Sequence, residues 1–140
     1  MAGRPTADSR EGTPLEIPDG IYERVSRLCL ALPEVTVRID YSRVRSRSTS
    51  HALYVRRRCF CLLIAVEGAG GHPVSQLVLR ADPVDCDALR SIGHPFYGTR
   101  AGPDRFRVVL THQTEWEEIR ELVTESYRFL APKKLRALVD

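Results

Sequence analysis

The stretch 114–139 constrains the fold most, because its apolar residues recur at steps of three and four. This spacing places them along one face of a helix. Thr114 followed by Glu117 predicts a capping box at the start. Pro132 cannot continue a helix and predicts its end, with a second short helix from about 133 to 139. The stripe consists of Trp116, Ile119, Leu122, Val123, Tyr127 and Leu130. We expect Trp116 and Tyr127 to be core anchors.

Charge is distributed unevenly along the chain. The opposite face of the 114–130 helix carries five glutamates and only two arginines. Residues 38–58 instead contain seven arginines against Asp40 alone, within a chain of net charge +3. Polyanions should therefore be steered to the 38–58 region and away from the long helix.

Length and composition indicate one soluble domain. The chain has 140 residues, of which 43% are hydrophobic and 28% are charged, as in ordinary globular proteins. Residues 1–17 are rich in Pro, Gly, Ser, Thr and charge, which predicts a disordered tail before a single domain over 18–140. There is no apolar run of about 20 residues, no apolar signal-peptide core and no disulfide-like cysteine pattern. We expect a cytoplasmic monomer without a membrane contact.

Alternating and helical patterns follow one another along the domain. A helix is predicted over 18–32 and a short helix over 83–92, where Asp82 is the cap and Gly93 the exit. Strands are predicted over 35–41, 53–56, 59–66, 74–81 and 105–111. Residues 59–66 are apolar on both faces, so that strand should be covered on both sides or lie near an end of the sheet. The pattern predicts an α+β fold: an N-terminal helix, about five mainly antiparallel strands with one embedded short helix, and two C-terminal helices packed on the sheet.

Several short motifs match a known family. They are Ala31-Leu32-Pro33-Glu34-Val35, the region 92–98, Ser126-Tyr127-Arg128 and Ala131-Pro132-Lys133-Lys134-Leu135. Over residues 18–139 the chain resembles the MmcQ/YjbR family, small bacterial proteins commonly labelled DNA-binding. The resemblance implies a YjbR/CyaY-like fold, related to frataxin, and DNA as a partner.

Other candidate sites are weaker. Cys59 and Cys61 would share one face of a strand, and we interpret them as buried, reduced thiols because a zinc site needs two more ligands. The four histidines have no partner at metal or triad spacing. The run 68–71 lacks the Lys-Ser/Thr of a phosphate loop and predicts a hairpin turn. The first helix has too few carboxylates for frataxin-like iron binding. We expect no metal and no cofactor.

The arginine-rich span has two interpretations. It is either a solvated face, paired in part with the acidic helix, or a surface for phosphate groups, which arginine forks match. Tyr41 and Tyr54 flank the span and could stack on bases. The candidate nucleic-acid-binding residues are Arg38, Arg43, Arg45, Arg47, Arg56, Arg57 and Arg58.

The functional prediction is a DNA-binding protein of the MmcQ/YjbR type that contacts the phosphate backbone with weak sequence preference. We expect no enzymatic activity. The alternative is a protein- or small-ligand-binding module of the same fold, with a pocket lined by His94, Tyr97 and Trp116. An enzyme that uses the Phe96-Tyr97 loop is a third reading.

Overall fold

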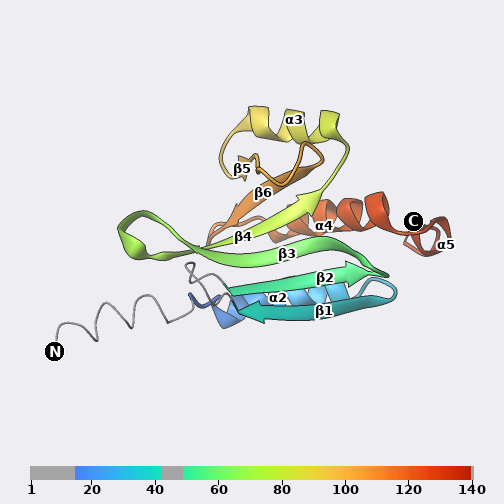
Figure 1. Cartoon of the computed structure of the whole chain (residues 1–140), viewed down its shortest axis with the longest axis horizontal. Coiled ribbons are helices and arrows are strands. Elements are labelled where there is room, and N and C mark those ends of the chain that lie inside the picture. The colour runs from blue at the N-terminus through green and yellow to red at the C-terminus, as the bar shows by residue number, and fades with distance from the viewer. Residues whose placement is uncertain (1–14, 42–48, 140) are drawn as a thin grey trace.

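Six antiparallel strands form one sheet in the computed structural model, which describes residues 15–41 and 49–139 (Figure 1). Their order across the sheet is β1-β2-β3-β4-β6-β5. The strands are β1 (Val35–Tyr41), β2 (Thr49–Val55), β3 (Arg58–Glu67), β4 (Pro73–Arg80), β5 (Phe96–Tyr97) and β6 (Arg105–Leu110). A short 3-10 turn, η1 (Ala69–Gly71), joins β3 to β4. The predicted α+β class is confirmed, and the expected strand count was one too low because β5 is too short to show alternation.

Among the described residues, helices pack on one face of this sheet and none packs on the other, which we call the open face. They are α2 (Asp19–Leu30), α3 (Pro83–Ile92), α4 (Trp116–Leu130) and α5 (Lys133–Arg136). Figure 1 views the open face, with α2 and α4 behind the strands and α3 beyond β5 and β6. The core lies between the sheet and these helices, around Leu53, Leu63, Leu77, Phe106 and Val123.

Helix α4 packs on β3 and β4 with the predicted stripe. Tyr127 is fully buried, donates its hydroxyl to the Pro33 carbonyl at 2.8 Å and meets the Phe60 ring edge-on. The expectation for Tyr127 is confirmed. Trp116 is only partly buried and lies beside the guanidinium of Arg24, so it is not a fully buried anchor.

The predicted capping box of α4 is wrong. The hydroxyl of Thr114 accepts the backbone N–H of Thr111 at 2.7 Å, and the helix begins at Trp116 without a side-chain cap. The Thr114 oxygen closes the preceding turn and is therefore not available to the helix. The cap of α3 is confirmed, because Asp82 accepts the N–H of Val84 at 2.9 Å and Pro83 follows as the first helical residue.

A β-bulge separates the two neighbouring thiols. The register shifts so that Leu53 pairs with Cys61 while Tyr54 pairs with Cys59, which leaves Phe60 as the extra residue. Phe60 and Cys61 are both buried in the core, and Cys59 lines the open face. The prediction that Cys59 and Cys61 share a face is therefore wrong. All four cysteines lie within the described residues and are free.

The core begins earlier in the chain than the sequence suggested. Leu15 and Ile17 are buried in the core, so the predicted tail boundary at residue 17 was too late. Two isolated apolar residues among prolines and charges carry no periodicity that would reveal this. In the described ranges, no helix has both the length and the apolar character required to cross a bilayer.

Candidate nucleic-acid interface

A groove of about 670 Å³ lies on the open face of the sheet. Its floor is apolar, since Ala52, Leu62 and Val78 are register neighbours on β2, β3 and β4. The other lining residues are Arg38, Ser50, Tyr54, Arg57, Arg58, Cys59, Arg80 and Arg105. Five arginines and no carboxylate are thus among the described lining residues.

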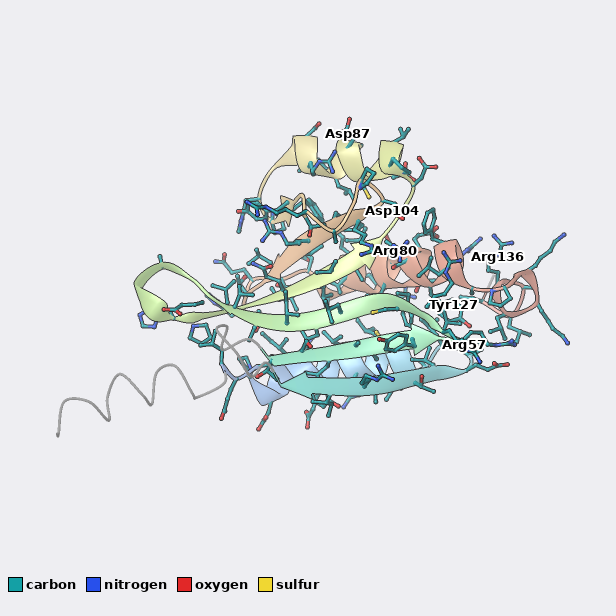
Figure 2. All side chains as sticks on the ribbon, in the orientation of Figure 1. Arg57, Arg80, Asp87, Asp104, Tyr127 and Arg136 are labelled. Carbon is teal, nitrogen blue, oxygen red and sulfur yellow. The ribbon has the colours of Figure 1, made fainter. Side chains whose placement is uncertain are left out.

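The arginines come from four places in the sequence. Arg38 projects from β1, Arg57 lies in the turn between β2 and β3, and Arg58 follows it as the first residue of β3. Arg80 and Arg105 are register partners at one end of β4 and β6. Figure 2 shows Arg57 and Arg80 toward the same end of the sheet. The sheet therefore gathers around one groove charges that are up to 67 positions apart in the chain.

A strained turn sets the position of Arg57 and Arg58. The β2–β3 connection has only two residues, Arg56 and Arg57, and Arg56 has a φ of 59°. Glu34 also has a positive φ, 58°, and its carboxylate binds the Arg56 guanidinium at 2.7 Å. Residues other than glycine adopt this region rarely. The ion pair joins these two strained positions, and the Arg56 guanidinium is already bound to a carboxylate.

Arg80 and Arg105 share one carboxylate. Arg80 donates to Asp104 at 2.7 Å, and the Nε of Arg105 lies 3.9 Å from the other Asp104 oxygen. The Arg80 hydrogen bond lowers the pKa of Asp104, so the carboxylate is ionised near neutral pH. Two guanidiniums around one carboxylate leave an excess of one positive charge. Within the described residues, the Nε of each arginine has no hydrogen-bond partner.

Helix α4 fixes the backbone beneath this cluster through Ser126. The fully buried Ser126 hydroxyl donates to the Phe60 carbonyl and accepts the N–H of Arg80 at 2.8 Å. Both are backbone groups next to the bulge, where the β3–β4 ladder ends at the pair Cys61 and Leu79. One side chain from the covered face therefore forms hydrogen bonds with backbone groups of two strands at the edge of the groove.

Tyr54 and Cys59 pair across β2 and β3 at the groove. The Arg38 guanidinium lies 5.7 Å from the centre of the half-buried Tyr54 ring. Burial raises the pKa of the Cys59 thiol, which keeps it protonated and weakly nucleophilic. The groove therefore offers cations, an aromatic ring and an apolar floor.

No acidic residue of α4 is among the described residues that line the groove. Glu117 pairs with Arg120, and Glu125 lies 4.0 Å from Arg128, within the same helix. The interpretation in which the arginine span pairs with the acidic helix does not hold for the described residues. There, Arg56 binds Glu34 and Arg80 binds Asp104.

The structure brings together only part of the predicted arginine set. Arg38, Arg57 and Arg58 line the groove, and Arg56 is paired beside it. The predicted residues Arg43, Arg45 and Arg47 lie outside the described residues. Sequence reasoning missed two lining arginines, Arg80 and Arg105. Alternation in 105–110, where Arg105 is out of phase with Phe106 and Val108, is the sequence signal that would have placed Arg105 on the open face.

The structure brings together two of the three residues predicted to line a second pocket. The His94 Nδ1 lies 2.8 Å from the Tyr97 hydroxyl, so these two residues do meet. Trp116 packs beside Arg24 and does not line the cavity of about 230 Å³ next to His94. The first residue of α4 points toward α2, which helical spacing alone does not specify. In the part of the chain that the structure describes, no three His, Cys, Asp or Glu side chains are grouped as metal ligands would be.

Comparisons with known proteins agree with this architecture. The profile of the YjbR family matches residues 30–129. The fold is similar to the crystal structure of Deinococcus radiodurans protein DR2400, of domain family DUF419, with a TM-score of 0.60 and 16% identity. That alignment covers 93% of this chain and 89% of the other chain, which shows a shared fold. No curated protein matches the chain.

Proposed function

The chain belongs to the YjbR family, and from this premise and the chemistry of the groove we propose that it is a DNA-binding protein. The observation that carries the proposal is the groove itself, which five arginines line on a sheet face that no described helix covers. Arginine forks bind phosphate oxygens in a bidentate manner. The DNA backbone is the polyanion that such a surface suits.

The role we propose is binding without catalysis. The groove holds no described carboxylate or histidine among its lining residues, and its only thiol has a raised pKa. No described helix enters the groove with polar side chains that would read base edges. Phosphate contacts position a protein on DNA without specifying sequence, so weak sequence preference follows.

A salt titration tests the proposal. Fluorescence anisotropy of a labelled duplex should show binding that weakens between about 50 and about 200 mM salt. Four or five arginine contacts predict a slope of log affinity against log salt of about −4, at about 0.9 per contact. Absence of binding at the lower salt concentration, both to this duplex and to its separated single strands, would contradict the proposed function.

A cleft between α3 and α4 supports the alternative of a small-ligand-binding module. It has a volume of about 310 Å³ and an apolar lining that includes Leu89, Phe106 and Leu122. Pockets for small molecules are mostly apolar and of about 300–1,000 Å³. If the duplex titration shows no binding, this cleft becomes the first place to look for function.

A further inference from the structure

From the groove we infer that the preferred ligand is an unpaired nucleic-acid strand, with bases on the apolar floor and phosphates on the arginines. This inference rests on the proposed function and specifies its ligand. Three observations carry it: the apolar residues of β3, the arrangement of charge across the sheet, and the position of Tyr54.

Strand β3 is apolar on both faces, but helices cover only one of them. Leu62 and Ile64 alternate with the buried Cys61, Leu63 and Ala65, so they point to the open face. An open face of an antiparallel sheet normally carries polar residues. In residues 15–41 and 49–139 no element packs over Leu62 and Val78, which line the groove. An apolar surface in a basic groove indicates a ligand with an apolar part as well as negative charge.

One row of register partners shows how charge and apolar surface alternate across the sheet. It runs from Arg38 through Ala52, Leu62 and Val78 to Arg107. These residues span four strand spacings, or about 19 Å at about 4.8 Å per spacing. A ligand that crosses the strands would meet the Arg38 cation at one end and apolar side chains after it, whereas Arg107 at the other end donates its guanidinium to the Gly98 carbonyl and to Gln76. An extended polynucleotide has the corresponding alternation of phosphates and bases.

Tyr54 supplies an aromatic surface inside the groove. It pairs with Cys59, lies beneath the Arg38 guanidinium and is half-buried. Bases stack on such side chains regardless of their sequence. A base on Tyr54 would bring its phosphates to the neighbouring arginines Arg38, Arg57 and Arg58.

A duplex does not use these features. Its bases are paired and stacked inside, so a protein surface outside the grooves meets only phosphates and sugars. The major groove admits a helix or a two-stranded ribbon, whereas this groove lies on a six-stranded sheet face. Duplex binding would leave Tyr54, Leu62 and Val78 without contacts to bases.

The test compares four labelled ligands of about 12 units each by anisotropy with the full chain: oligo(dT), an abasic strand of the same length, a duplex and oligo(U). Oligo(dT) should bind about tenfold or more tightly than both the abasic strand and the duplex, because stacking adds to the phosphate contacts. Oligo(U) distinguishes DNA from RNA as the source of the strand, and either preference supports an unpaired strand.

Two variants locate the effect. Tyr54→Ala should remove about tenfold of the oligo(dT) affinity and lower the duplex affinity by much less, while Tyr54→Phe keeps the ring and the affinity. Equal binding of the abasic strand or the duplex by the unmodified protein would overturn the inference, even if Tyr54→Ala fails to fold. It would leave DNA binding through phosphates standing. Absence of binding to every ligand would overturn the proposed function as well.

Discussion

Ser126 links helix α4, on the covered face of the sheet, to the strand backbone beside the groove. Its hydroxyl bonds the Phe60 carbonyl and the Arg80 N–H, and all three groups are shielded by α4. Ser126→Ala should lower the free energy of unfolding by about 2–4 kcal/mol, because each buried backbone group left unpaired costs about 1–3 kcal/mol. Urea unfolding measures this loss.

Thr124→Ala is the matched control for this variant. The Thr124 hydroxyl donates within α4 to the Arg120 carbonyl, and its removal should change stability by less than about 0.5 kcal/mol. An equally small change for Ser126→Ala would show that water or a shift of the strands satisfies the two backbone groups.

We expect His51 to make the free energy of unfolding depend on pH. It lies 4.5 Å from the Tyr22 ring, with a buried Nδ1 that lacks a partner among the described residues, and burial lowers its pKa. The unfolded state, with a pKa of about 6.5, therefore takes up the proton first. The contribution of neutral His51 to the free energy of unfolding is fully present above the unfolded pKa. It is lost as the pH falls from the unfolded pKa toward the lower folded pKa.

Urea unfolding at about pH 7.5 and about pH 5.5 tests this direction. The protein should be less stable at the lower pH, and His51→Gln should reduce the difference. His112→Gln, at an exposed position, should leave the difference as it is. A pH dependence that survives unchanged in His51→Gln would contradict the assignment.

At the scale of elements, the sequence predicts a helix limit correctly where that limit depends only on residues adjacent in the chain. Helix α3 begins at Pro83, after the cap residue Asp82, and ends before Gly93. The sequence predicted these limits because a cap acts over three residues. The Thr114 hydroxyl bonds Thr111 instead of the helix, a choice between two local partners that the motif does not decide. The bulge at Phe60 depends on the partner strand, so the two cysteines could not be assigned to faces from their spacing.

In the candidate site, too, residues adjacent in the chain could be predicted and residues brought together by strand pairing could not. Arg57 and Arg58 were found because they follow one another in a basic run. Arg80 and Arg105 come from separate strands and meet only because β4 and β6 are neighbours, although β5 and α3 lie between them in sequence. Clusters of this kind follow from strand order, which hydrophobic patterns do not specify.

Asp104 limits the charge that β4 and β6 present to a ligand. It binds Arg80 at 2.7 Å, and Arg105 lies nearby. Asp104→Asn should tighten DNA binding and make the salt slope steeper by up to about 0.9, because a phosphate no longer competes with a carboxylate. Anisotropy titrations at several salt concentrations measure both quantities.

Asp87→Asn makes the same charge change on α3, where Asp87 pairs with Arg90. Figure 2 shows Asp87 on α3, apart from Arg80 and Asp104. This control should alter the slope by much less. Equal gains in the two variants would mean that net charge, and not the groove, determines affinity.

The whole molecule is dipolar, with arginines on the open sheet face and glutamates on the helix that covers the other face. The groove contains Arg57, Arg58 and Arg80, whereas Glu117, Glu118 and Glu121 are exposed on α4. Such a distribution orients a polyanion before contact and lowers the number of unproductive encounters. Because arginines occur both in the groove and on α4, the same loss of charge can be made on either face of the protein by substitution.

The most direct test of the DNA-binding groove compares two double variants with equal loss of charge. Arg57→Ser with Arg58→Ser removes two groove cations, and Arg120→Ser with Arg128→Ser removes two cations from α4. In anisotropy titrations with the labelled duplex, the groove variant should lose about 1.8 from the salt slope, at about 0.9 per contact. The α4 variant should keep the slope of the unmodified protein. Equal slopes in both variants, whether reduced or not, would contradict the assignment of the groove as the site of DNA binding.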